Sequence, residues 1–350
     1  GMSSAAFWII VLFLYAGVAS LLPVWMLLQP RDYINGLQLF VGLGLLYLAI
    51  FISNPTVVAP AINHNVPEGT PGIMPLLFVT VACGAISGFH GVVASGTSSK
   101  QLNNENDARL VGYFGAVGEG LLALGTIVAT TSGFATLAAW EEVYSAFNEG
   151  GAAAFVQAGG GILNAGLAIP ESLSATILAT MAVLFAATTM DTGVRLQRFV
   201  TAEIFELFNI KLNVFMSTLV VLLTGFALAF SAGGDGRGGM IIWPLFGTTN
   251  QLLAALTMSI LVVILLRTKR PVWPVLIPLI FVFFVSMYAA IIQLGTFIAE
   301  GNWLLVVIDA IILMAAVWVV LAAVSSMVRT RNQPLDLDEQ MEDISAGSSV

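Results

Sequence analysis

Charge and cysteine are scarce in this 350-residue sequence, and each scarcity excludes a class of protein. Only 9% of the residues are charged, whereas a soluble domain has about 25%. The single cysteine, Cys83, has no partner for a disulfide or a thiolate metal cluster. Two histidines are too few for an expected transition-metal centre, and no cofactor is predicted. The Lys and Arg residues are scattered, which argues against nucleic acid as a partner.

Motifs of catalysis and nucleotide binding are also missing. The sequence has no GxxxxGK[ST] pattern, which argues against a built-in ATP motor. It has no HExxH pattern, and no pairing of a nucleophile with a base is recognisable. We therefore do not expect an enzyme.

Apolar residues are abundant instead, at 58% of the chain with a mean hydropathy of +0.95. A soluble fold of this size could not hide so much apolar surface from water. Continuous apolar runs of roughly 20 residues predict an all-α, polytopic membrane helix bundle. Hydropathy places about nine spans, at residues 7–28, 36–52, 74–96, 110–131, 173–190, 212–230, 250–266, 272–294 and 303–327.

The distribution of basic residues predicts the orientation of these spans. Connections after the odd-numbered spans hold eleven of the twelve Lys and Arg residues, and the other connections hold only Arg237. Positive charge collects in short cytoplasmic loops, so we expect the N-terminus outside and the C-terminus in the cytoplasm. The transmembrane domain is predicted over residues 1–331, followed by an acidic, disordered cytoplasmic tail over residues 332–350.

Two connections between spans are predicted to be helical. Residues 138–155 are expected to form an interfacial helix on the outer side. Residues 191–208 mix charged and apolar residues at helical spacing, so they are expected to continue the fifth span as an amphipathic helix.

Charged residues inside spans are candidates for function, because each costs about 2.5–3.5 kcal/mol to insert. Glu119 lies near the middle of the fourth span, where it could take up a proton or pair with a cation; a structural hydrogen bond is the alternative. Asp309 lies one to two turns inside the last span, from which it could reach the outer interface. Asp191 and Arg195 are four residues apart at the inner end of the fifth span, which predicts an ion pair acting as a gate or an anchor.

Interruptions in the apolar runs give a second set of candidates. Glycines at residues 84–91 predict a broken third span, which either lines an ion or substrate cavity or permits close helix packing. His90 in this run could relay protons or bond to a backbone carbonyl. The hydroxyl cluster that follows, Ser95, Thr97 and Ser98, suits an alkali ion, so Na⁺ or H⁺ is the expected coupling ion.

Polar and aromatic residues next to two prolines complete the candidate pathway. Trp25 follows Pro23 at the end of the first span. Asn250 and Gln251 enter the seventh span after a Trp-Pro pair, and their amides need polar partners inside lipid.

Five motifs in a fixed order resemble the carbon starvation protein A family. They are LPVWMLLQPRDY at residues 22–33, ACGAISGFH at 82–90, SGT at 95–97, DTGVR at 191–195, and WPLFG with the following Asn-Gln pair at 243–251. The resemblance covers residues 22–266 and implies a bacterial inner-membrane transporter that imports peptides or pyruvate when carbon is scarce. We expect a proton or sodium gradient to drive it, and a membrane sensor of nutrient limitation is the alternative.

The resemblance also implies a relation to the amino acid/polyamine/organocation transporter superfamily, whose core is two inverted five-helix repeats. This chain would then hold the second repeat and extra helices, and its partners would include N-terminal helices of the same protein. Residues 23–30 would correspond to the second broken helix of that core. The hydroxyl cluster would fall on a helix that often supplies sodium ligands.

Overall fold

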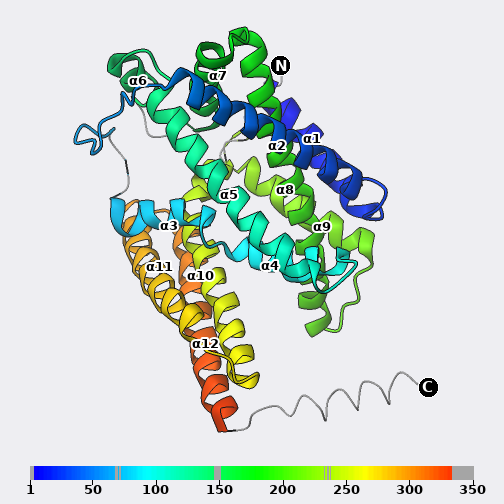
Figure 1. Ribbon diagram of the computed structural model, residues 1–350. Helices are drawn as coiled ribbons and strands as arrows, with labels where there is room; N and C mark the ends of the chain where they lie inside the picture. Colours follow the sequence, from blue (N-terminus) through cyan, green and yellow to red (C-terminus); the bar gives the residue numbers. More distant parts are fainter. Residues whose placement is uncertain are drawn as a thin grey trace. The chain divides into compact units, whose positions relative to one another are not determined.

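The computed structural model describes residues 4–67, 70, 72–145, 151–231, 233, 234, 236 and 238–332, and this part contains no strand. Eight helical segments are long and apolar enough to cross a membrane, and a ninth, Val214–Ala229, is a shorter apolar helix (Figure 1). Each of the nine predicted spans overlaps one of these segments, but the first helix ends at Leu21 and not at residue 28 as predicted. The predicted polytopic membrane helix bundle is confirmed. The predicted tail, residues 332–350, lies outside the described residues except for Asn332, which ends α12.

The chain divides into two compact units, which are described separately. The first unit comprises Gly1–Pro71 and Gln101–Ile241, and the second comprises Gly72–Lys100 and Ile242–Val350. The helices of the first unit are α1 Ser4–Leu21, α2 Leu28–Ser53, α5 Asp107–Ser132, α6 Leu137–Val143, α7 Gly151–Leu167, α8 Glu171–Leu207 and α9 Val214–Ala229. Those of the second are η1 Ile73–Leu77, α3 Phe78–Val81, η2 Ala82–Gly84, α4 Gly88–Gly96, α11 Trp273–Ala299 and α12 Trp303–Asn332, with most of η3 Ser98–Gln101 and of α10 Gly238–Arg267.

Helix α7 forms the centre of the first unit. It packs against α2, α5 and α8, and Leu46, Leu163 and Leu178 join in one buried apolar cluster. A Cβ on Gly166 would lie 2.4 Å from the Ala49 carbonyl oxygen, so glycine permits the backbones of α7 and α2 to touch.

The predicted interfacial helix over residues 138–155 is therefore wrong in its second part. Helix α6 covers Leu137–Val143, but Phe155 belongs to α7 and is buried in the core. Gly and Ala supply most of the contacting face of α7, and they add little to hydropathy. Close backbone packing buries this helix although its side chains are small.

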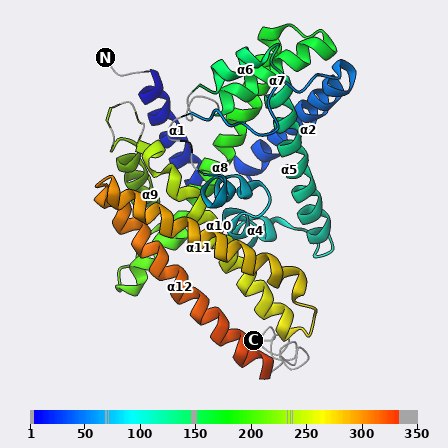
Figure 2. The same ribbon diagram turned by 90° about the vertical axis from the view of Figure 1, so that its left-hand side faces the viewer.

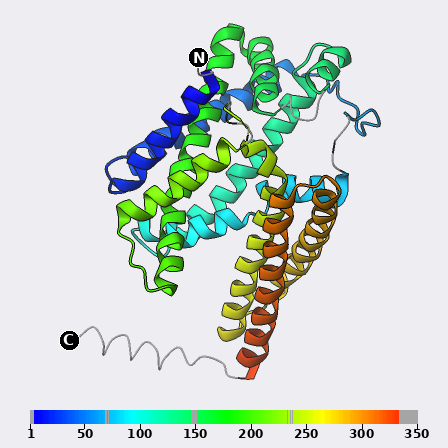
Figure 3. The same ribbon diagram turned by 180° about the vertical axis from the view of Figure 1, so that it is seen from behind.

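Helix α8 runs unbroken for 37 residues, from Glu171 to Leu207, which confirms that the amphipathic segment continues the fifth span. Its C-terminal half packs with α1 and α9 through Ala16, Val194 and Val221 (Figure 3). Residues 22–27 connect α1 to α2, so the interruption at Pro23 lies between two spans rather than within one. The correspondence with a second broken helix stays a prediction.

In the second unit, α10, α11 and α12 pack along their lengths, and α11 and α12 run side by side (Figure 2). The third span is broken as predicted. Its first part ends at Gly84, residues 85–87 are not helical, and α4 begins at Gly88. The break frees backbone groups that must find partners elsewhere.

Candidate functional site

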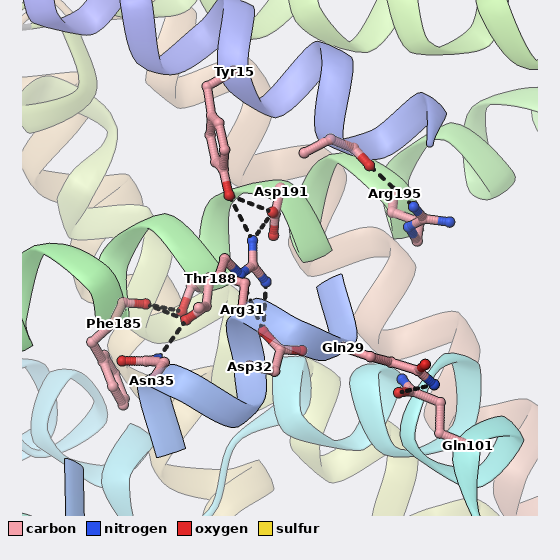
Figure 4. Close-up of polar contacts among 12 residues, drawn as sticks. Tyr15, Gln29, Arg31, Asp32, Asn35, Gln101, Phe185, Thr188, Asp191 and Arg195 are labelled. Atoms are coloured by element: carbon pink, nitrogen blue, oxygen red, sulfur yellow. Dashed lines mark hydrogen bonds and ion pairs between the residues drawn. The ribbon is translucent and has the colours of Figure 1, made fainter. Parts of the chain in front are cut away.

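A buried ion pair joins α2 to α8 in the first unit (Figure 4). The Asp191 side chain is fully buried, and its Oδ2 accepts hydrogen bonds from Arg31 Nη1 and, at 3.3 Å, from the Tyr15 hydroxyl. Arg31 Nη1 also donates to the Tyr15 hydroxyl at 3.0 Å. Arg31 keeps a second acidic neighbour, Asp32, at 2.6 Å. A carboxylate is costly to bury unless it is paired, and here three helices supply the pairing.

The predicted pair between Asp191 and Arg195 is not formed. Arg195 lies one turn along α8, but its Nη2 donates to the backbone carbonyls of Ala19, at 3.1 Å, and Leu22, at 2.6 Å. Two physical reasons account for this. Asp191 already has Arg31 from α2, and the last carbonyls of α1 have no partner within their own helix and attract a cation. The gate role of these residues stays a prediction, with Arg31 as the partner of Asp191.

A second arginine binds the same helix end. Arg198 Nη1 donates to the Ser20 carbonyl, so two guanidinium groups of α8 cap the C-terminus of α1. Arg31, Tyr15 and Arg198 are functional candidates that were not predicted from the sequence. A usable signal existed for Arg198, which lies one helical turn beyond Arg195 and therefore on the same face.

The break in the third span is held by the amides of α10. Asn250 Oδ1 accepts hydrogen bonds from the Phe89 N–H at 2.9 Å and from Ser87 Oγ at 3.2 Å. Gln251 Nε2 donates to the Ile86 carbonyl at 2.9 Å. Only 5% of Asn250 and 1% of Gln251 is exposed. The expectation that these amides need polar partners is confirmed. The partners are the Ser87 hydroxyl and two backbone groups freed by the break.

Glycine makes this contact possible. A Cβ on Gly88 would lie 2.4 Å from the Asn250 carbonyl oxygen and 2.5 Å from the Ala254 nitrogen, both backbone atoms. Close packing and a broken helix, which the sequence left as alternatives, therefore occur together. One atom of each amide, Asn250 Nδ2 and Gln251 Oε1, is buried without a hydrogen-bond partner among the described residues. Such atoms are rare in proteins and provide one donor group and one acceptor beside the break.

The hydroxyl cluster at the end of α4 bonds partly to its own backbone. Ser95 Oγ donates to the Val92 carbonyl at 3.1 Å, and the Thr97 N–H, which caps α4, donates to the Val93 carbonyl at 2.9 Å. Ser98 is half-buried at the start of η3. Because a donating hydroxyl keeps oxygen lone pairs, the alkali-ion site stays a prediction.

The remaining candidates are divided between the units. Glu119 is half-buried on α5, and Trp25, 66% exposed, lies between α1 and α2, both in the first unit. His90 is exposed on α4 in the second unit, with Asn250 and Gln251. In the part of the chain that the structure describes, no three His, Cys, Asp or Glu residues group as metal ligands would.

The first unit also contains a cavity of about 780 Å³ between the end of α5 and helices α6, α7 and α8. Small apolar residues such as Gly160, Ala175 and Ala179 line most of it, with Gln157 and Glu171 as polar members. This lining suits an apolar group better than an ion.

A broken span held by buried amides, together with an internal ion pair, is typical of membrane bundles that provide a pathway for polar solutes. The chain belongs to the carbon starvation protein CstA family, whose family model matches residues 2–141 and 133–289. This membership confirms the resemblance found in the sequence motifs.

Curated relatives cover most of this chain. It is 30% identical to the peptide transporter CstA of Campylobacter jejuni over 84% of this chain and 49% of the relative. It is also 30% identical to the peptide transporter CstA of Escherichia coli, over 75% of this chain and 46% of the relative. It is 28% identical to the pyruvate/proton symporter BtsT of Escherichia coli, over 79% of this chain and 49% of the relative. The chain thus spans about half the length of these relatives, and no solved structure matches it significantly.

Proposed function

We propose that this chain forms part of a secondary transporter that imports peptides or pyruvate-like carboxylates, driven by a proton or sodium gradient. We place it in a bacterial inner membrane, with the N-terminus outside and the C-terminus in the cytoplasm, and in the response to carbon starvation. Relatives named as a peptide transporter and as a pyruvate/proton symporter support the substrate class.

The observation that supports this proposal is the broken third span and the two amides that bind it, Asn250 and Gln251, which we call the amide clamp. A break exposes backbone groups that lipid cannot satisfy, so it is tolerated only inside protein or beside a polar cavity. Asn250 provides an unpartnered Nδ2, and a carboxylate substrate requires such donors. Gln251 provides an unpartnered Oε1, which suits a cation.

The test is uptake of labelled pyruvate and a labelled dipeptide into proteoliposomes that contain the whole transporter. An imposed pH or sodium gradient should drive accumulation of one substrate above its equilibrium level. Asn250→Ala should lower this uptake at least tenfold. Asn213→Ala, which removes a capping side chain of α9, is the matched control and should leave uptake near the wild-type rate. The proposal is overturned if neither gradient drives accumulation of either substrate.

Glu119 receives a separate test in the same vesicles. Glu119→Gln keeps the size of the side chain and removes the charge, so proton-driven uptake should be lost while substrate exchange without a gradient persists. Wild-type coupling in this variant would remove Glu119 from the mechanism without affecting the rest of the proposal.

A further inference from the structure

Asp309 is a buried acid that the proposed pathway does not use. It lies in the second turn of α12, none of its surface is exposed, and both carboxylate oxygens lack a hydrogen-bond partner among the described residues. An ionised carboxylate in such a place costs far more than a paired one, so it must be neutralised by something it binds. Asp309 also lies beyond residue 289, where the match to the family model ends.

The packing of three helices places two further buried polar residues near the level of Asp309 along the bundle. Leu245 of α10, Phe297 of α11 and Leu305 of α12 form one buried apolar cluster. One turn further along the same faces, each helix carries a buried polar residue. These residues are Thr248, Gln293 and Asp309. Helix α11 runs antiparallel to α10 and α12, so the step back from Phe297 to Gln293 goes the same way as the steps forward from Leu245 to Thr248 and from Leu305 to Asp309. The three polar residues are therefore expected at one level of the bundle.

These three residues offer oxygen atoms to a cation. Thr248 Oγ1 donates to Gln293 Oε1 at 2.6 Å, and the two residues are 1% and 6% exposed. Oxygens from a hydroxyl, an amide and a carboxylate are what hard cations prefer. A cavity of about 230 Å³ lies between the same helices, with Thr249 and Ile312, sequence neighbours of Thr248 and Asp309, in its mostly apolar lining.

The charges that could compensate Asp309 within the protein lie elsewhere. Helix α10 has one titratable residue, Arg267, at its end, and α11 has Tyr288, which is 57% exposed. Glu300 is exposed where α11 ends, and Arg329 is 20 residues from Asp309 along α12, or about 30 Å. The η1 and α3 segments that pack on α11 contain no titratable residue. Side-chain pairing therefore leaves Asp309 uncompensated among the described residues.

We propose that Asp309 is a binding site for a monovalent cation, a proton or Na⁺, which neutralises its carboxylate within the α10, α11 and α12 bundle. Thr248 and Gln293 are the neighbouring ligands when the ion is Na⁺. This inference rests on the proposed function only in identifying the bound ion with the coupling ion. The binding itself is measurable without transport.

Infrared difference spectroscopy of the purified whole protein in lipid nanodiscs tests this site. The sample is first held in sodium-free buffer at neutral pH, where a protonated carboxylic acid gives a carbonyl band separate from that of a carboxylate. We expect this band in the wild type and its loss in Asp309→Asn, which has nearly the same shape. Asp191→Asn is the matched control and should keep the band, because Asp191 is ion-paired to Arg31.

Added salt then distinguishes the two ions. If millimolar NaCl removes the Asp309 band and choline chloride does not, the site binds Na⁺ in competition with a proton. If neither salt affects the band, the site holds a proton. If the spectra of the wild type and Asp309→Asn agree in the protonated-acid region at every pH from 5 to 8, the carboxylate is ionised and the proposal is overturned. These results stand whether or not uptake of pyruvate or peptide is found.

Discussion

The two units stabilise their buried polar groups by different means. In the first unit, the Asp191 carboxylate is paired with the Arg31 guanidinium, and two further arginines bind the carbonyls at the end of α1. In the second unit, the neutral amides of Asn250 and Gln251 bind the broken third span. Removing one partner of a buried ion pair leaves a charge, whereas removing one amide leaves only a dipole. We therefore expect the ion pair to hold the helices of the first unit in one arrangement, and the helices around the amides of the second unit to tolerate rearrangement.

The largest effect that tests this comparison is expected at the ion pair. Asp191→Ala removes the buried acidic partner of the Arg31 guanidinium, whose side chain is only 12% exposed. The unpaired charge should lower the free energy of unfolding by about 3–5 kcal/mol. The double variant Arg31→Met with Asp191→Leu removes both charges and should be destabilised less than Asp191→Ala. Reversible denaturation in detergent micelles measures both.

Asp32 provides the control for this experiment. It lies 2.6 Å from Arg31, but its side chain is 47% exposed, so Asp32→Asn should cost no more than about 1 kcal/mol. The single variants Arg31→Met and Asp191→Leu complete the comparison. If their losses of unfolding free energy add up to the loss in the double variant, the two side chains do not stabilise each other, and the contrast between the units disappears.

An intermediate effect is expected where the second unit depends on packing. Gly88→Ala places a Cβ against the backbone of α10, which cannot move aside as a flexible side chain can, and should cost about 1–3 kcal/mol. Gly84→Ala is the matched control, because its Cβ would meet no atom within 4 Å. Thermal unfolding of the two variants in nanodiscs gives the comparison. Equal melting temperatures would mean that the close contact at Gly88 does not hold the break in place.

The spans could be predicted from the sequence because lipid imposes one simple rule on each of them. A long apolar run with charge at its ends has few alternatives to a spanning helix. The break near Gly84 could be predicted from the glycines that interrupt the apolar run, although close helix packing was an alternative explanation for them. Helix α7 was not predicted as a buried helix, because its burial comes from backbone contact between glycines and alanines, which a hydropathy profile does not detect.

The candidate site was less predictable, for a different physical reason. Spacing along α8 placed Asp191 and Arg195 on one face, but the partner of each is decided by α1 and α2, which lie more than 150 residues away in the sequence. Asn250 and Gln251 could be foreseen as needing partners, because amides inside lipid are costly. The identity of those partners required the fold.

The smallest expected effects compare a helix cap from each unit. Ser87 Oγ accepts from the His90 N–H at the start of α4, as Asn213 Oδ1 accepts from the Met216 N–H at the start of α9. Loss of either cap by substitution with Ala should cost about 1 kcal/mol. Ser87 also donates to the buried Asn250 Oδ1, so Ser87→Ala should cost more than Asn213→Ala. Hydrogen exchange at the His90 and Met216 amides measures each loss locally. If the two costs are equal, the Ser87–Asn250 hydrogen bond contributes nothing, and the break in the second unit is held by packing and by the amide hydrogen bonds to the Phe89 N–H and the Ile86 carbonyl.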